Sequence, residues 1–173
     1  CCGYNSIDHI FENSLITIEN MVKSTDELRE LLDTRFTKDE TENMINSMIE
    51  NGFTDLVSAF QNYMFRFHSR KGEKNSKPND FQVIEKGNDI FRRDLGFGYD
   101  DILNKVELDR LHCDFQQRHI IEHNGGIIDR RYLEKVPKSV YKLNQRIIIK
   151  EDDVLDMLRF ISLLVSEIKN QTN

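Results

Sequence analysis

The apolar pattern is clearest in the C-terminal segment, which begins after three acids, Glu151, Asp152 and Asp153. Its apolar residues recur every three or four positions, which places their side chains on one face of an α-helix. Because carboxylates stabilise a helix N-terminus, the acids mark where this helix begins. The stripe consists of Val154, Met157, Leu158, Ile161, Leu164, Val165 and Ile168.

Hydroxyl residues followed by acids predict earlier helix starts. The Ser24-Thr25 pair caps one helix, and Thr37 caps a second through a capping box with Glu40. The Asn51-Gly52 pair is typical of a helix end, so we expect the second helix to stop there and a third to follow, capped by Thr54. The third helix has the apolar stripe Leu56, Val57, Phe60, Met64 and Phe67.

A polar break separates these helices from the next one. Residues 69–79 contain lysines, a glycine and one of the two prolines, a composition typical of a loop. Asn79 or Asp80 is placed to cap the following helix. We expect that helix to reach about Leu95, because Gly96 comes next.

A long helix is predicted over residues 100–124. It begins at the Asp100-Asp101 pair, and Gly125-Gly126 is a strong signal for its C-terminal end. A short helical segment over 129–136 follows and is ended by Pro137.

Two stretches favour an extended conformation. Residues 14–18 alternate apolar and polar side chains like a short strand, and residues 145–150 are rich in β-branched side chains. The pattern as a whole predicts an all-α helical bundle of five to seven helices without internal repeats.

Residues 1–22 are interpreted as an N-terminal lead-in that precedes the domain, and residues 23–173 as the helical domain itself.

The N-terminal residues suggest a truncated neighbour. The sequence does not begin with methionine, so we expect a fragment, and Cys1-Cys2 fits the trailing edge of an upstream zinc ribbon. A frayed terminus is the simpler interpretation. The three cysteines have no disulfide spacing, no signal peptide is visible, and no apolar run approaches the roughly 18–20 residues of a membrane helix. These features predict a cytoplasmic protein without a membrane partner.

Charge is unevenly distributed along the chain. The net charge of −6 argues against a protein that coats nucleic acid generically. Residues 1–50 carry eleven acids and four bases, whereas residues 126–150 carry seven bases and two acids. A basic flank of this kind can hold a phosphate backbone on one side of the molecule, although a solvated surface of mixed charge has the same composition.

One heptapeptide has a composition that packing alone does not explain. An arginine, two histidines, a carboxylate and an amide crowd the end of the long helix, in the order Arg118, His119, Glu122, His123 and Asn124. A histidine can serve as a general acid or base, and the helix end should raise its affinity for a proton. An arginine can hold a phosphate through two hydrogen bonds. Together these groups suffice for RNA transesterification without metal or cofactor.

The segment Arg118–Leu133 (RHIIEHNGGIIDRRYL) resembles the signature of HEPN domains, an arginine followed by a polar residue and, five positions after the arginine, by a histidine and an asparagine. The resemblance implies a helical bundle that acts as a homodimeric, metal-independent ribonuclease of toxin–antitoxin, phage-defence or CRISPR systems. It assigns Arg118, His119 and His123 to catalysis, with Asn124 in support. An antitoxin or a fused domain is the implied protein partner, and RNA is the implied substrate.

Further roles follow less directly from the residues near this motif. Glu122 is placed to orient Arg118 by an i,i+4 ion pair. Arg130 and Arg131 are candidates for lining an RNA path, and Tyr132 for stacking a base, although packing in the core is the more ordinary role for a tyrosine.

Two alternatives use the same residues. His119-x-x-Glu122-His123 is also the inverted zinc-peptidase pattern, for which Glu134, Glu151 and Glu167 are the candidate third ligands. No pattern supports any of the three, so no metal is expected. The second alternative is a catalytically silent module that binds RNA or a nucleotide, or that dimerises a larger protein.

Overall fold

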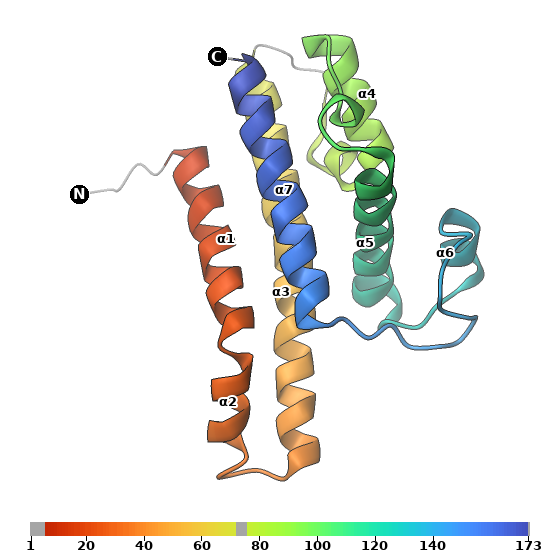
Figure 1. The fold of residues 1–173 in the computed structure, drawn as a ribbon. Helices are drawn as coiled ribbons and strands as arrows, with labels where there is room; N and C mark the ends of the chain where they lie inside the picture. Colours follow the sequence, from red (N-terminus) through yellow and green to blue (C-terminus); the bar gives the residue numbers. More distant parts are fainter. Residues whose placement is uncertain (1–5, 72–75, 173) are drawn as a thin grey trace.

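The computed structural model describes residues 6–71 and 76–172 (Figure 1). The expected all-α bundle of five to seven helices is confirmed, with two short 3-10 helices in addition. Within the described ranges, no helix combines the length and apolar composition needed to cross a bilayer. The elements are α1 (Ile7–Lys23), α2 (Thr25–Leu32), α3 (Lys38–Arg70), η1 (Pro78–Gln82), α4 (Ile84–Leu95), η2 (Tyr99–Asp101), α5 (Lys105–Asn124), α6 (Arg130–Lys135) and α7 (Glu151–Thr172).

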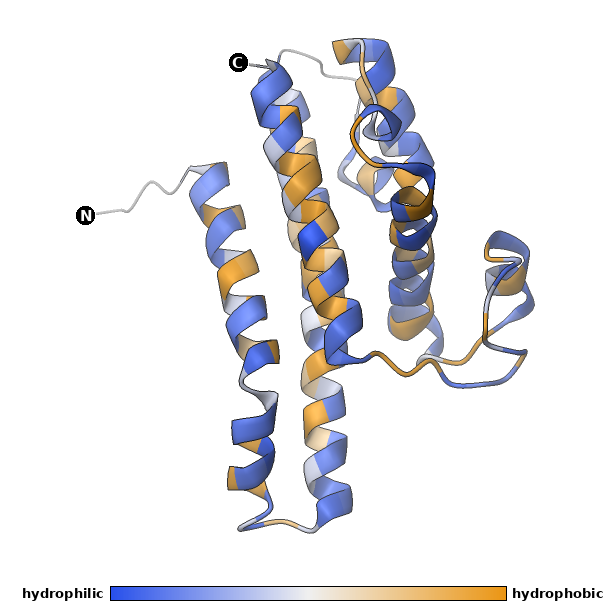
Figure 2. Cartoon of the chain, in the orientation of Figure 1, coloured by the Kyte–Doolittle hydropathy of each residue, from blue (hydrophilic) through white to orange (hydrophobic). Residues whose placement is uncertain are grey.

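Helix α3 is the spine of the bundle. Its 33 residues run beside α1 and α2, which follow one another along its length, and beside α7 (Figure 1). Helix α5 packs against both α3 and α7, and α4 lies beside α5. Apolar residues are interspersed with polar ones along the helices (Figure 2), so each helix can turn an apolar face toward the core.

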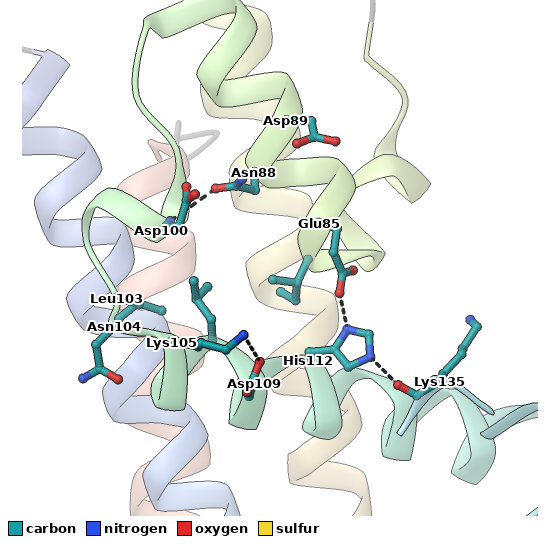
Figure 3. A pocket seen from close by; sticks show the side chains of 12 residues that line it. Glu85, Asn88, Asp89, Asp100, Leu103, Asn104, Lys105, Asp109, His112 and Lys135 are labelled. Carbon is teal, nitrogen blue, oxygen red and sulfur yellow. Dashed lines mark hydrogen bonds and ion pairs between the residues drawn. The ribbon is translucent and has the colours of Figure 1, made fainter. Parts of the chain in front are cut away.

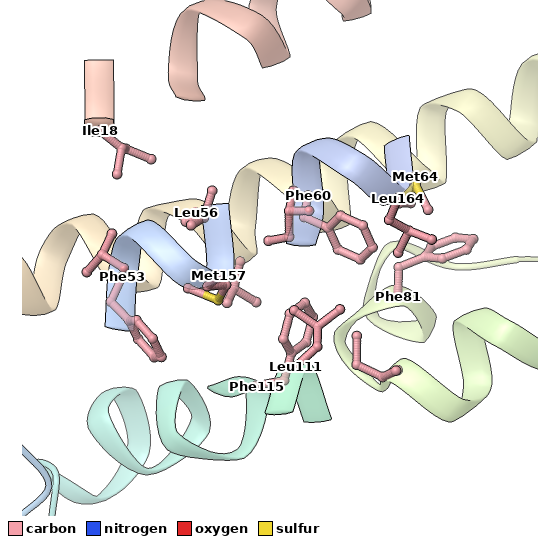
Figure 4. Packing of buried hydrophobic residues seen from close by; sticks show 14 of the residues in the cluster. Ile18, Phe53, Leu56, Phe60, Met64, Phe81, Leu111, Phe115, Met157 and Leu164 are labelled. Atoms are coloured by element: carbon pink, nitrogen blue, oxygen red, sulfur yellow. The ribbon is translucent and has the colours of Figure 1, made fainter. Parts of the chain in front are cut away.

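The core forms where α3, α5 and α7 meet (Figure 4). Phe60 of α3 is fully buried and meets Phe115 of α5 edge to face, with ring centroids 5.7 Å apart. Burying a side chain of this size stabilises the fold by about 1.5–3 kcal/mol. The core residues drawn around Phe60 include Phe53, Leu56, Met64, Leu111, Met157 and Leu164.

The predicted helix end at Asn51-Gly52 is wrong, because α3 continues without interruption through both residues. Gly52 is buried, and a Cβ atom there would lie 2.5 Å from Cε of Met21 in α1. The glycine therefore lies within α3, where it packs against side chains of α1, and does not end the helix. Thr54 is not a cap; its hydroxyl donates to the carbonyl of Asn51 within the helix, at 2.9 Å.

The expected lead-in with an extended stretch at 14–18 is also wrong, because these residues belong to α1. Ser6 caps α1 by accepting a hydrogen bond from the backbone N–H of His9, at 3.1 Å. Residues 7–22 then bury one apolar face in the same core as the rest of the chain: Ile7, Phe11, Leu15, Ile18 and Val22. The zinc-ribbon suggestion for Cys1-Cys2 lies outside the described residues.

Most predicted helix ends are confirmed, and two starts are displaced. Neither Asn79 nor Asp80 caps α4, because both lie in η1 and α4 begins at Ile84. Thr37 and Glu40 form the expected capping box, and Gly96 ends α4 in the left-handed conformation, with φ of 83°. Helix α5 begins later than expected, because the Asp100-Asp101 pair lies in η2. The side chain of Asn104 caps α5 instead, accepting hydrogen bonds from two backbone N–H groups, at 2.9 and 3.1 Å.

Residues 137–150 form an arm that returns from α6 to the start of α7 (Figure 1). The expected extended stretch at 145–150 has one antiparallel bridge, between Ile127 and Arg146, and no strand. The Arg146 guanidinium donates to the carbonyl of Gly125 at 2.7 Å and to the carboxylate of Glu50 at 2.9 Å. The arm therefore ties the end of α5 to α3.

Candidate functional site

The end of α5 is fixed by a glycine turn. Gly125 takes the left-handed conformation with φ of 58°, and Gly126 follows with φ of 78°. The backbone N–H groups of both glycines donate to the carbonyl of Ile120. The Asn124 side chain donates to the carbonyl of Ile127, so it stabilises the turn.

Arg118 lies almost wholly inside the protein. It is 7% exposed, and its Nη2 donates to Oε1 of Glu122 at 2.8 Å, as the i,i+4 spacing predicts. Its Nε atom is buried and has no hydrogen-bond partner among the described residues. The guanidinium is thus oriented by one carboxylate, and its unpartnered Nε is enclosed by protein rather than open to a ligand.

The two histidines lie next to each other on the same side of α5. The ring centroids of His119 and His123 are 4.6 Å apart, with an interplanar angle of 58°. The side chain of His123 is 61% exposed, and its Nε2 lies 3.9 Å from Oε2 of Glu122. The cluster therefore joins an oriented arginine, a partly buried imidazole and an exposed one.

Burial lowers the pKa of His119, and the nearby His123 lowers it further. His119 therefore does not gain the proton affinity that a helix end is expected to give a histidine, because burial disfavours the charged imidazole. Lys135, Arg131 and Arg118 add smaller repulsions in the same direction. The neutral, proton-accepting form of His119 is favoured.

The flanking predictions have different outcomes. Arg130 and Arg131 are exposed on α6, where RNA could reach them. Tyr132 is 2% exposed and its hydroxyl lies 3.7 Å from Sγ of Cys113, so the proposal that it stacks a base is wrong. The ring packs in the core because α6 turns that side toward α5.

Sequence reasoning missed Lys135. It lines a shallow depression of about 10 Å³ beside His119, together with Arg131. Arg131 and Lys135 are one turn apart on α6, so the i,i+4 spacing was the signal. The depression is too small for a nucleotide, so in the single chain the histidines lie at an open surface.

A zinc site at His119 and His123 lacks support from the other side chains. Among residues 6–71 and 76–172, no group of three or more histidine, cysteine, aspartate or glutamate side chains is placed to hold a metal. One candidate third ligand, Glu151, instead bonds Arg29 and Thr25, at 3.3 and 3.1 Å.

A cleft of about 710 Å³ lies between α4, η2 and α5 (Figure 3). His112, to which the sequence assigned no role, bridges it by an ion pair with Glu85 at 2.5 Å and a hydrogen bond with the carbonyl of Lys135 at 3.2 Å. Glu85 raises the pKa of His112 through this contact. His112 precedes His119 by seven residues, a spacing that the sequence shows and that puts both on one side of α5.

Helix α5 also buries a carboxyl group. Asp114 is fully buried, and neither of its oxygens has a hydrogen-bond partner in the described part of the chain. Nε of Arg110 lies 3.1 Å from Oδ1 of Asp114, while the same guanidinium bonds Asp153 of α7. Burial raises the pKa of Asp114 to about 7.

Comparison with known proteins adds no relative. No protein-family model, curated protein or solved structure matches this chain.

Proposed function

We propose that this chain is a metal-independent endoribonuclease of the HEPN type, acting as a cytoplasmic homodimer in a toxin–antitoxin or phage-defence system. The observation that carries the proposal is the geometry of Arg118, His119 and His123: an arginine oriented by Glu122, at the same helix end as two adjacent imidazoles. Attack of a 2′-hydroxyl on the adjacent phosphate needs groups of this kind: a base, an acid and a cation that stabilises the phosphate charge.

The reaction uses the RNA's own 2′-hydroxyl as nucleophile. His119 accepts the hydroxyl proton because its neutral form is favoured. The O2′–P bond forms, the P–O5′ bond breaks, and His123, which is open to solvent, gives a proton to the departing O5′. Arg118 stabilises the negative charge that grows on the phosphate. The products are a 2′,3′-cyclic phosphate and a 5′-hydroxyl.

The open surface around the histidines supports a dimer. A depression of about 10 Å³ cannot enclose a nucleotide, so the proposal places two copies of the site facing one shared cleft. The exposed Arg130 and Arg131 on each α6 would hold the phosphates that flank the cut.

The test is RNA cleavage in excess chelator by purified wild-type protein and by Arg118→Ala, His119→Ala and His123→Ala variants. We expect each substitution to slow cleavage by about 10²–10⁴-fold. His9→Ala is the matched control, because His9 is exposed on α1. Cleavage that chelator abolishes would favour the zinc alternative, and equal rates in all variants would remove these residues from the mechanism.

One observation favours the silent module as a second candidate. Arg118 is 7% exposed and already paired with Glu122, so its charge is neutralised in this conformation. A module of this kind would bind RNA and leave it uncut. Binding without any cyclic phosphate product, in a protein shown to be dimeric, would establish it.

A further inference from the structure

The cleft between α4 and α5 has an apolar floor and walls of mixed charge. Ile84 and Leu103, which are 4% and 2% exposed, contribute to the floor, with Leu108 beside them. Its volume of about 710 Å³ is in the range of sites for small organic ligands. Four carboxylates and three basic side chains line it: Glu85, Asp89, Asp100 and Asp109, with Lys105, His112 and Lys135 (Figure 3).

Two of these carboxylates are available to a ligand. Glu85 is held by His112 and Asp100 by Arg92, at 2.5 and 2.6 Å. Asp89 has no ion pair or hydrogen bond within the described part of the chain. Asp109 has one exposed pair with Lys105 at 3.8 Å, which contributes little.

The cleft and the histidine cluster are neighbours on one face of α5. His112 in the cleft and His119 in the cluster are seven residues apart, two helical turns or about 10 Å along the axis. Lys135 lines both the cleft and the depression beside His119. A nucleotide next to the scissile phosphate can therefore reach the cleft.

The hydrogen-bonding groups of the cleft select which part of that nucleotide enters. The free carboxylates accept hydrogen bonds from a base, whereas an ionised phosphate offers them no donor. Guanine offers two adjacent donors, N1–H and the N2 amino group, which match the two oxygens of one carboxylate. The amide of Asn88 uses Oδ1 to accept from the backbone of Asp100 at 3.2 Å, which leaves its NH₂ to donate to guanine O6.

We propose that this cleft is a guanine-binding subsite, in which Asp89 or Asp109 accepts the two donors of the base edge. The inference rests on the proposed ribonuclease function for its biological use, since it makes guanine the preferred base beside the cut. The apolar floor supplies the surface against which the ring packs.

The test measures nucleoside binding directly, without RNA cleavage. Guanosine, inosine, adenosine and cytidine are titrated into the whole protein, followed by backbone amide NMR shifts. We expect guanosine to bind about tenfold or more tightly than inosine, which lacks the N2 amino group, and to shift the signals of α4 and α5 around the cleft. Asp89→Asn or Asp109→Asn should abolish the preference. Asp156→Asn, which removes an exposed carboxylate on α7, is the matched control.

The outcomes separate this inference from the proposed function. Guanosine binding in the cleft supports the subsite even if no RNA is cut, in which case the ribonuclease proposal alone fails. Equal affinity for all four nucleosides, or a guanosine preference that survives both substitutions, overturns the subsite. Cleavage of RNA at equal rates beside all four bases also overturns it while leaving the ribonuclease intact.

Discussion

Replacing Asp114 by asparagine should make the protein more stable at alkaline pH. The folded protein raises the pKa of this carboxyl from 3.8 to about 7, mainly by burying it. Asp114 is 0% exposed, and its oxygens have no hydrogen-bond donor within the described residues, although Arg110 partly compensates the charge. The folded state therefore prefers the protonated form, and asparagine resembles that form in shape and neutrality.

The sign and magnitude follow from linkage. A group whose pKa is higher in the folded state stabilises it fully below pH 4 and loses that contribution as pH rises through about 7. A difference of about three pKa units corresponds to up to ~4 kcal/mol. The free energy of unfolding of Asp114→Asn, minus that of the wild type, should thus rise by several kcal/mol between pH 4 and pH 8.

Urea unfolding at a series of pH values measures this difference. If the substitution also loses stability because the contact with Arg110 is broken, that loss shifts the difference in free energy of unfolding by the same amount at every pH. The slope of this difference with pH is therefore the diagnostic quantity. Asp109→Asn is the matched control, since Asp109 is an exposed carboxylate on the same helix, and its difference should stay flat. A flat difference for Asp114→Asn as well would refute the assignment of a raised pKa.

Three further outcomes are expected. Glu122→Gln removes the charge that neutralises Arg118, so RNA affinity should increase several-fold at low salt in a filter-binding assay; unchanged affinity would mean that the arginine does not reach the phosphate. Gly125→Ala and Gly96→Ala each place a side chain at positive φ and should cost about 1–2 kcal/mol in thermal unfolding. Only the Gly125 variant should also slow RNA cleavage, and equal slowing by both would point to a general loss of stability. Because the pKa of His119 is lowered, the acid limb of the pH–rate profile should lie below the ordinary histidine value of 6.5, and His119→Ala should remove it.

Local chemistry made much of the fold predictable. Thr37, Gly96 and Gly125 act where the sequence placed them, because caps and left-handed turns depend on a few neighbouring residues. Gly52 misled the prediction because its role depends on α1, which lies far away in sequence. Residues 14–18 also misled the prediction, because the apolar pattern of only five residues fits a strand as well as it fits one face of α1.

The candidate site was predictable only in part. The cluster from Arg118 to His123 lies within a single helix, so its spacing already implied the ion pair and the adjacent rings. Burial of Tyr132 depends on how α6 folds back on α5, and the lowered pKa of His119 depends on the same packing. The cleft joins α4, η2 and α5, whose relative placement no local pattern contains.

The contacts of Arg146 have a consequence for how the molecule opens. One guanidinium connects the turn after α5, the returning arm and the middle of α3, while the backbone N–H of Ile147 donates to the carbonyl of Gly126 at 2.8 Å. The turn therefore cannot fray without also releasing the arm. We expect its amide hydrogens, notably that of Ile128, which donates to the carbonyl of Gln145, to exchange with solvent almost as slowly as those of the central helices. A surface loop beside the histidines would then belong to the most slowly opening unit of the protein. Local opening elsewhere in the chain would therefore leave the relative positions of Arg118 and both imidazoles unchanged.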